Sequence, residues 1–313
     1  MEAERNCRYP VPELVLGKAL AAGETGEKWL LELDRLVDEL AAAWHIHVGE
    51  VLHGGSHALV CAATTENGEN RVLKVEIPDI SEAEFLYGVH ALRIADGNGY
   101  AKLYTYDVEK RACLLERLGK PLKQLHFSVE EQIRIICDAL LQTWKMPVGD
   151  AVLQQGDGSL DWFSDYIPQA WEKLHEPCPR FVIDKALTCL ASRKKQRDPE
   201  GYVVLHGDAH NNNTLEVPGQ PGKFKLIDSE GILYEKAYDL GVLMREWPES
   251  YANDPVCAQH ERALFLHDLT GVDTDAILDW GFLQMTTTAL VLLQAGETVL
   301  SHQMLDIAKA WCV

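Results

Sequence analysis

Apolar and polar positions repeat with two different periods in the first part of the chain. Between residues 27 and 44, leucine and valine recur every three or four positions, which predicts a helix with one buried face. From residue 48 onward the period shortens to that of β-strands. The apolar runs are 48–52, 59–63 and 72–75, with turns at 53–57 and 66–70. Consecutive strands joined by tight turns predict an antiparallel meander.

A helical stretch at 80–95 follows this meander. Two more β-type runs, 100–106 and 112–118, come next, and Gly119-Lys-Pro121 ends the second of them. Glycine and proline interrupt regular structure, so this tripeptide suits a hinge between two lobes.

After the hinge the pattern becomes mostly helical, and the long apolar series at 278–300 is expected to form the core of this part. A length of 313 residues leaves room for two lobes with a sizeable core. We therefore expect an α+β chain. Residues 1–118 would form a small antiparallel-sheet lobe with an N-terminal helical extension, and residues 119–313 a mainly helical lobe.

Composition narrows the class of partner. The chain has 48 acidic and 29 basic residues, for a formal charge of −19, which argues against nucleic acid or an anionic membrane as partner. Acidic surfaces mostly serve solubility, so the charge by itself does not identify a cationic ligand. The eight cysteines include no Cys-x-x-Cys pair and indicate reduced, mostly packed thiols. Without an apolar leader or a run of about 18 apolar residues, we expect a cytoplasmic protein.

The richest chemistry lies in Val-Leu-His-Gly-Asp-Ala-His-Asn-Asn-Asn, residues 204–213. Asp208 follows a short apolar run, Asn213 comes five residues later, and Asp228 closes another apolar run fifteen residues after Asn213. We expect these groups at the ends of two adjacent strands. Phosphoryl transfer needs a carboxylate that orients and deprotonates a hydroxyl, plus oxygen ligands that hold Mg²⁺ on nucleotide phosphates. Asp208 is the candidate base, and Asn213 and Asp228 are the candidate metal ligands.

The alternative for residues 204–213 is a hydrogen-bonded turn with no catalytic role, because Asn and Asp favour turns.

A lysine within a β-branched strand points to a second part of the same site. Lys74 needs a carboxylate partner and a ligand if it is buried, and the next helix offers Glu84 or, alternatively, Glu82. An edge-strand lysine that reaches solvent is the competing interpretation. A glycine-rich turn lies before Lys74 in the sequence. This turn could fold over phosphates, or it could be a plain hairpin turn. Its residues are Gly54, Gly55 and Ser56.

The spacing His-Gly-Asp-x-His-x-x-Asn resembles the catalytic loop of the protein-kinase-like fold. Gly207, where protein kinases usually carry arginine, makes the loop similar to the aminoglycoside and choline kinase branch. Other segments occur in the order seen in the streptomycin 6-phosphotransferase and hydroxyurea phosphotransferase family, so the resemblance covers nearly the whole chain. They include Gly-Glu-Lys-Trp-Leu at 26–30, Val-Leu-Lys-Val at 72–75, Leu-Leu-Glu-Arg-Leu-Gly at 114–119 and Ala-Tyr-Asp-Leu at 237–240.

The resemblance implies a bilobal kinase-like fold and an O-phosphotransferase that uses ATP and Mg²⁺, with antibiotic resistance as the family's best-known outcome. It also implies that the hinge binds adenine, mainly through the main chain of Glu116, Arg117 and Leu118. Asp239 would brace the catalytic loop, although its place before an apolar helix is also typical of a helix cap.

The chain departs from this family at Asp228-Ser229, where Asp-Pro is common, and at 234–236, where Gly-Asp-Pro is common. The acceptor therefore stays open between streptomycin, another aminoglycoside, hydroxyurea and another small hydroxylated metabolite. A guanidino or amino sugar would need carboxylates and a stacking ring. Candidates by position, each otherwise an ordinary surface or packing residue, are Asp161, Trp162, Glu230, Glu235 and Trp280.

Two rival functions remain. A protein kinase is disfavoured because neither Asp-Phe-Gly nor Ala-Pro-Glu follows Asp228. A nucleotide-binding module without turnover is disfavoured because the base, both metal ligands and the strand lysine are all present. The residues do not distinguish ATP from GTP, and they do not fix the oligomeric state.

Overall fold

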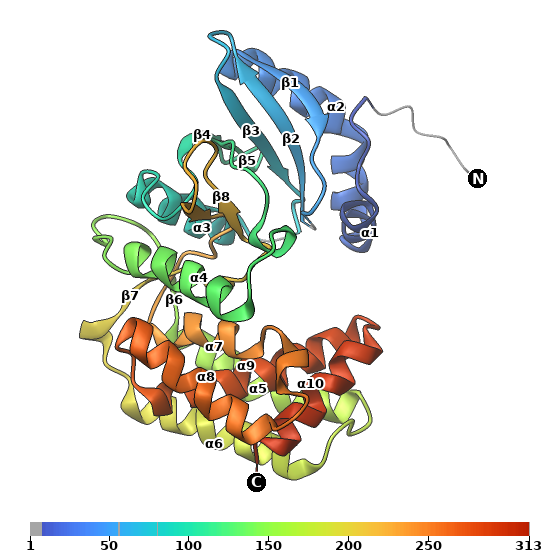
Figure 1. The fold of residues 1–313 in the computed structure, drawn as a ribbon. Coiled ribbons are helices and arrows are strands. Elements are labelled where there is room, and N and C mark those ends of the chain that lie inside the picture. Colours follow the sequence, from blue (N-terminus) through green and yellow to red (C-terminus); the bar gives the residue numbers. More distant parts are fainter. Residues whose placement is uncertain (1–7, 56, 80, 313) are drawn as a thin grey trace.

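The computed structural model describes residues 8–55, 57–79 and 81–312, which form two stacked lobes (Figure 1). The described part of the upper lobe carries a five-stranded antiparallel sheet in the spatial order β1-β2-β3-β5-β4. Its strands are β1 (Ile46–Val51), β2 (Ala58–Thr65), β3 (Asn70–Glu76), β4 (Leu103–Asp107) and β5 (Ala112–Glu116). In the register, Lys74 lies between Val60 of β2 and Cys113 of β5. Lys74 is therefore on a central strand, and the edge-strand interpretation is wrong.

Helices α1 (Glu13–Ala21) and α2 (Glu24–Trp44) cover one face of this sheet. The periodic stretch at 27–44 is thus confirmed as a helix, which begins slightly earlier than expected. Leu33 of α2 packs in one apolar cluster with Leu73 of β3. Because successive strand side chains point to opposite faces, Lys74 points away from these helices.

Helix α3 (Glu82–Ala95) lies beside the other face and touches the loop after β9 (Phe224–Leu226). Ser81 caps it: the Ser81 Oγ accepts from the Glu84 N–H at 3.1 Å, and the Glu84 carboxylate accepts from the Ser81 N–H at 2.7 Å. A Cβ atom on Gly88 would lie 2.6 Å from the main-chain oxygen of Ser229. Only glycine permits this approach, so α3 and the loop are held at backbone contact.

The segment after β5 crosses to the lower lobe beside β8 (Thr214–Glu216). The Gly119 N–H donates to the Glu216 carbonyl at 2.8 Å, and the Glu216 N–H donates to the Lys120 carbonyl at 3.0 Å. Cys113 and Leu115 of β5 share an apolar cluster with helices of the lower lobe. The hinge therefore lies where Gly119-Lys-Pro121 predicted, while a division of the chain at residue 118 stays a prediction.

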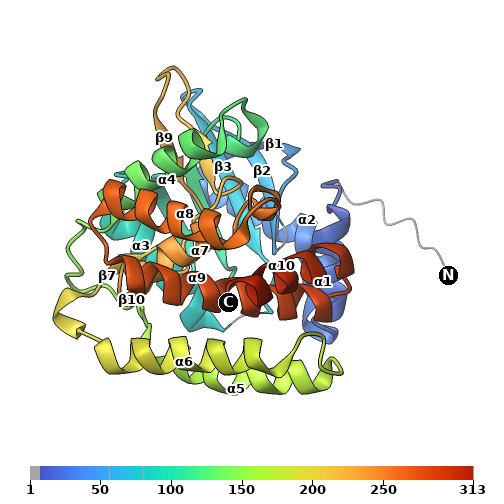
Figure 2. The same cartoon turned by 60° about the horizontal axis from the view of Figure 1, so that its bottom comes forward.

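The lower lobe is mainly helical, as expected. Figure 2 shows α5 and α6 side by side along its outer edge, and α9 packs against both as well as against α7, α8 and α10. The helices are α4 (Val129–Thr143), α5 (Asp157–Lys173), α6 (Arg180–Gln196), α7 (Ala237–Arg245), α8 (Pro255–Thr270), α9 (Thr274–Gln294) and α10 (Thr298–Ala310). Short strands β6 (Gln154–Gln155), β10 (Ile232–Tyr234) and β7 (Val203–Leu205) form one small sheet, and β8 pairs with β9. Short 3-10 turns lie at Leu122–Gln124, Pro199–Gly201 and Pro248–Tyr251.

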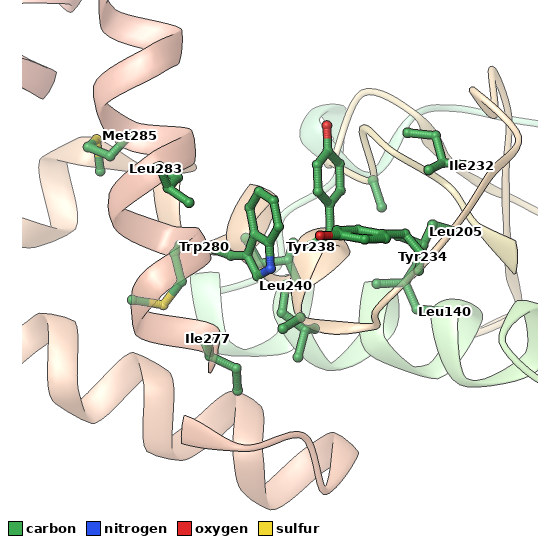
Figure 3. Packing of buried hydrophobic residues seen from close by; sticks show 14 of the residues in the cluster. Leu140, Leu205, Ile232, Tyr234, Tyr238, Leu240, Ile277, Trp280, Leu283 and Met285 are labelled. Atoms are coloured by element: carbon green, nitrogen blue, oxygen red, sulfur yellow. The ribbon is translucent and has the colours of Figure 1, made fainter. Parts of the chain in front are cut away.

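Aromatic side chains fill the core around α9 (Figure 3). Trp280 is fully buried and meets the rings of Tyr234 and Tyr238 edge-on, with centroids 5.8 and 4.8 Å away. By length and composition α9 could cross a membrane, but 67% of its apolar window is buried inside the structure, as in the core helix of a lobe. Most of the described thiols are packed, as expected, with free buried cysteines at 61, 113, 137, 178 and 189, whereas Cys257 is exposed and Cys312 is half-buried.

Candidate active site

A buried histidine fixes the main chain that carries Asp208. His206 is fully buried and stacks on Tyr100, with ring centroids 5.7 Å apart. Its Nδ1 accepts from the Asp208 N–H at 3.1 Å, and its Nε2–H donates to the Ile227 carbonyl at 2.7 Å. This pattern requires a neutral ring, in agreement with burial, which lowers the pKa of His206. His206 therefore ties the loop after β7 to the loop after β9.

The two loops belong to different small sheets, so the expectation of two adjacent strands is wrong. Hydrogen bonds across the gap replace strand pairing. The Asn213 side-chain amide donates to the Asp208 carbonyl at 3.1 Å, and the Ile227 N–H donates to the Asn213 carbonyl at 2.9 Å. Asp228 follows immediately, in a left-handed conformation with φ of 60°. The predicted base and both predicted metal ligands are thus brought together.

Asp239 braces the catalytic loop from the start of α7. One carboxylate oxygen accepts from the Gly207 N–H at 2.8 Å, and the other accepts from the His206 N–H at 3.1 Å and the Trp144 indole N–H at 2.9 Å. The implied bracing role is confirmed. Gly207 itself has a φ of 91°, and a Cβ atom there would lie 2.5 Å from the Glu230 carboxylate. Glycine is therefore required at this position.

Two basic groups flank the Asp208 carboxylate. Arg245 donates to one oxygen, and His210 Nε2 lies 3.2 Å from the other. Arg245 ends α7 and is anchored on α9, where it donates to Gln284 at 2.9 Å and Thr288 at 3.1 Å. Burial acts to raise the pKa of Asp208, but the hydrogen bond with His210 and the charge of Arg245 outweigh it and lower that pKa. Sequence reasoning missed Arg245, whose local signal is only a lone arginine at the end of an apolar helix.

Lys74 has carboxylate partners, but they are not the predicted ones. Its Nζ lies 2.7 Å from Glu76 and 3.0 Å from Asp228. Burial acts to lower the pKa of Lys74, and the two carboxylates raise it above its usual value. The expected partner Glu84 is wrong, because its carboxylate caps α3. Glu82 is also absent from the ion pairs of the described residues. Glu76 can reach Lys74 because residues two apart on a strand share a face.

A cleft of about 540 Å³ opens beside these ion pairs. Lys74, Asn213 and Asp228 line one part of it. Apolar wall residues are Leu52, Val60, Val72, Ala101, Leu115 and Ile227. An apolar slot that ends in a cation, a carboxylate and an amide suits a nucleotide, with the base between apolar walls and a divalent cation at the oxygen ligands. The donor set therefore fits ATP and Mg²⁺.

The predicted loop and hinge residues line the same cleft, except Ser56, which lies outside the described residues. They are Gly54, Gly55, Glu116, Arg117 and Leu118. The Glu116 carboxylate is occupied, since it accepts from the Lys102 N–H at 2.9 Å and the Lys225 ammonium at 2.7 Å. The Arg117 Nη1 is buried without a hydrogen-bond partner in the described part of the chain. A ligand in the cleft could satisfy this donor.

Glu230 is the predicted acceptor residue that the fold places beside Asp208. Its main-chain N–H donates to the His206 carbonyl at 2.8 Å, and its carboxylate packs over Gly207. The Glu230 side chain is exposed in this structure, yet partial desolvation by the surrounding loops and the charge of Asp208 both raise its pKa, to about 7. Glu230 therefore changes charge close to neutral pH.

The other acceptor candidates have different surroundings. Trp280 is wrong as an acceptor contact because it is fully buried, and its indole N–H donates to Glu235 at 2.6 Å. Half-buried Glu235 also accepts from buried Arg193 at 3.3 Å, so its carboxylate is already engaged by two donors. On α5, Asp161 pairs with Lys194 at 3.0 Å, and Trp162 stacks on Tyr166 with centroids 4.6 Å apart. These contacts give neither α5 residue a link to Asp208.

Comparison with known proteins gives three findings. A family model described as aminoglycoside/hydroxyurea antibiotic resistance kinase matches residues 43–296. Streptomycin 6-kinase of Streptomyces glaucescens is 25% identical over 315 residues, which is 99% of both chains. Hydroxyurea phosphotransferase of Kitasatospora aureofaciens is 22% identical over 301 residues, which is 95% of this chain and 84% of that one.

A solved structure confirms the fold. Amicoumacin kinase hAmiN, in complex with AMP-PNP, Ca²⁺ and Ami, superposes with a TM-score of 0.61 at 15% identity. The superposition covers 94% of this chain and 96% of that one. At this identity the likeness shows the bilobal kinase-like fold alone.

Proposed function

The chain belongs to the aminoglycoside/hydroxyurea antibiotic resistance kinases, and we propose that it transfers the γ-phosphoryl group of ATP to a hydroxyl of streptomycin or a related aminoglycoside. That it is a phosphotransferase acting on a hydroxyl group follows from the family. The proposal adds the acceptor, the metal and the roles of the residues. It also places the reaction in the cytoplasm.

One observation carries the assignment of roles. Asp208, Asn213 and Asp228 converge through hydrogen bonds of their own loops, and Lys74 reaches the same point from the sheet lobe. A base, two oxygen ligands and a phosphate-binding cation are the parts that phosphoryl transfer requires, since positioning and charge stabilisation supply most of the rate.

Each residue then has a task. Lys74 binds the phosphates, Asn213 and Asp228 hold the metal, and the main chain from Glu116 to Leu118 receives the base. When bound, ATP and Mg²⁺ supply the phosphoryl group and the positive charge that offsets its oxygens. Arg245 and His210 keep the Asp208 carboxylate ionised at neutral pH, because they lower its pKa.

Asp208 orients the acceptor hydroxyl and accepts its proton. As the acceptor oxygen bonds to the γ-phosphorus, the bond from that phosphorus to the β–γ bridging oxygen breaks and ADP leaves. A carboxylate whose pKa is lowered is a weak base, so it takes the proton late, after most of the bond to the leaving group is lost. Asp208 thus contributes chiefly by holding the hydroxyl in line.

Glu230 supports a cationic acceptor, because a second carboxylate beside Asp208 would bind a guanidinium or ammonium group. The departures from the related family do not oppose this acceptor. Ser229 donates to the Tyr100 hydroxyl at 3.2 Å within its own loop. Glu235 is held by Trp280 and Arg193. Both substitutions are therefore absorbed by local contacts.

The test is ATP consumption with Mg²⁺ in the presence of streptomycin, other aminoglycosides, hydroxyurea and simple amino alcohols. We expect streptomycin or a related aminoglycoside to raise turnover well above the rate without acceptor. Stimulation by hydroxyurea alone would replace the proposed acceptor while keeping the reaction. If no compound raises turnover although nucleotide binds, the assignment to aminoglycosides is wrong.

A further inference from the structure

The phosphate-binding lysine finds its carboxylate on its own strand. Glu76 lies 2.7 Å from the Lys74 ammonium, and both side chains are largely buried, at 17% and 19% exposed. The two residues are separated by one position on β3 and so share the face that looks into the cleft. Asp228 approaches the same ammonium at 3.0 Å from the other lobe.

An ammonium group has three N–H donors. Glu76 and Asp228 account for two of them, which leaves one for a ligand in the cleft. Removal of Glu76 would leave Asp228 as the carboxylate that orients Lys74. Because Asp228 belongs to the other lobe, the position of Lys74 would then depend on how the lobes lie relative to each other.

Helix α3 contacts the site by a different route. Its first-turn carboxylate, Glu84, accepts from the Ser81 N–H at 2.7 Å and serves the helix. The approach to the metal-binding loop is made by backbone: a Cβ atom at Gly231 would lie 2.1 Å from the Tyr87 carbonyl, and one at Gly88 would lie 2.6 Å from the Ser229 carbonyl. Such contacts position the loop but supply no charge to Lys74.

We propose that Glu76 is the positioning residue that holds Lys74 toward the nucleotide phosphates, and that α3 supplies no carboxylate for this purpose. The sheet lobe thereby carries a preassembled cation whose direction does not depend on α3. The inference rests on the proposed function only in requiring that the cleft bind a nucleotide. It does not depend on the identity of the acceptor.

The test compares Glu76→Gln with Glu84→Gln, two substitutions that each remove one charge and keep side-chain size. Calorimetry measures the binding of AMP-PNP with Mg²⁺ and, separately, the binding of adenosine. We expect Glu76→Gln to weaken AMP-PNP binding about 10-fold, since it removes one charge-assisted hydrogen bond, and to leave adenosine binding unchanged. Glu84→Gln retains a side-chain oxygen that can accept from the Ser81 N–H, so it should keep the cap, change the thermal midpoint little and leave both affinities unchanged.

A role limited to folding would weaken both ligands together, and this result would overturn the proposal. So would a loss of AMP-PNP affinity in Glu84→Gln. Glu76→Asp is a second variant that retains the charge and withdraws the carboxylate by one methylene. It should weaken AMP-PNP binding less than Glu76→Gln while adenosine binding is again unchanged.

A double variant separates an action through Lys74 from a direct one. In a Lys74→Met background, Glu76→Gln should change AMP-PNP affinity by less than about 2-fold, because the lysine that it positions is gone. A full 10-fold effect in that background would contradict the proposal. If the wild-type chain binds AMP-PNP but phosphorylates no acceptor, the proposed function fails and the role of Glu76 stands. If the wild-type chain does not bind AMP-PNP, both fail.

Discussion

Two charged clusters contribute to the site, and they are built in opposite ways. In the first, a cation lies between two carboxylates: Lys74 contacts Glu76 and Asp228. In the second, a carboxylate lies between two basic groups: Asp208 contacts Arg245 and His210. The first joins the sheet lobe to the lower lobe, whereas the second is contained within the lower lobe.

We assign the first cluster to nucleotide binding and the second to the chemical step. The first cluster has an excess of carboxylate, it includes the predicted metal ligand Asp228, and it borders the nucleotide cleft. The second keeps Asp208 ionised, because neighbouring positive charge lowers its pKa. Variants in the first cluster should therefore change nucleotide affinity, and variants in the second should change turnover and its pH dependence.

The largest effect is expected for Asp208→Asn. The neutral amide holds the hydroxyl in line less well and cannot take its proton, so kcat should fall by about 10²- to 10⁴-fold. AMP-PNP affinity should stay within about 2-fold of wild type, since Lys74 and Asp228 are untouched. Steady-state kinetics and calorimetry measure the two quantities. Asp150→Asn, at a carboxylate that is 89% exposed, is the matched control and should change neither; equal losses of affinity and turnover in Asp208→Asn would contradict the separation.

Lys74→Met should have the next largest effect and the opposite signature. Loss of a charge-assisted contact to the phosphates should weaken AMP-PNP binding about 10- to 100-fold, with adenosine affinity preserved. Lys102→Met serves as a control, because Lys102 forms an exposed pair with Asp96. Undiminished AMP-PNP affinity in Lys74→Met would remove Lys74 from the phosphate site.

The residues that the first two predictions change can be identified from the sequence alone. The spacing from His206 to Asn213 and the lysine in a β-branched run identified the reacting end of the cleft, because chemistry restricts which residue types occur at such intervals. The hinge also followed from the Gly119-Lys-Pro121 breaker, and the helical lobe from periodicity. Each of these features depends on residues that are near one another in the sequence.

Contacts that depend on tertiary structure could not be predicted from the sequence in this way. Glu76 and Glu84 both stand close to Lys74 in the chain, and the choice depends on the strand face and on the use of Glu84 as a cap. Arg245 reaches Asp208 only because α7 packs on α9. Trp280 is a candidate stacking ring for the acceptor by its position in the sequence, but tertiary packing buries it. A buried contact made by distant elements leaves no spacing to detect.

Glu230→Gln should change the affinity for the acceptor while sparing nucleotide affinity. At pH 8 Glu230 is mostly ionised, since its pKa is raised to about 7, and the variant should raise the KM for streptomycin roughly 10-fold. Below pH 6 the wild-type carboxyl is protonated and the two proteins should converge. Initial rates across this pH range measure the difference. A KM ratio that is independent of pH would exclude Glu230 as the acceptor's carboxylate.

The same raised pKa affects stability. A carboxyl whose folded pKa lies above its unfolded value destabilises the folded state as pH rises between the two values. Glu230→Gln should therefore have a higher thermal midpoint than wild type at pH 8 and a similar one at pH 4. Thermal unfolding at the two values checks the sign, and a lower midpoint at pH 8 would show that the ionised carboxylate is instead stabilising.

The smallest effect near neutral pH is expected for Arg245→Met. Without the guanidinium, the pKa of Asp208 should rise by about 1 to 3 units, because an adjacent opposite charge lowers a carboxyl pKa by that amount. The acid limb of kcat/KM should move to higher pH by the same interval. Arg93→Met, which removes an exposed arginine paired with Asp150, should leave the limb in place. An unmoved limb in Arg245→Met would show that Arg245 does not set the charge of Asp208.

The most direct test of the central claim is mass spectrometry of streptomycin after incubation with the protein, ATP and Mg²⁺, with Asp208→Asn in parallel. The account predicts streptomycin carrying one added phosphate group with the wild-type protein, and at most a trace with the variant under the same conditions. Unmodified streptomycin in the presence of a wild-type protein that binds nucleotide would contradict the proposed acceptor. Equal product from the variant would contradict the role of Asp208.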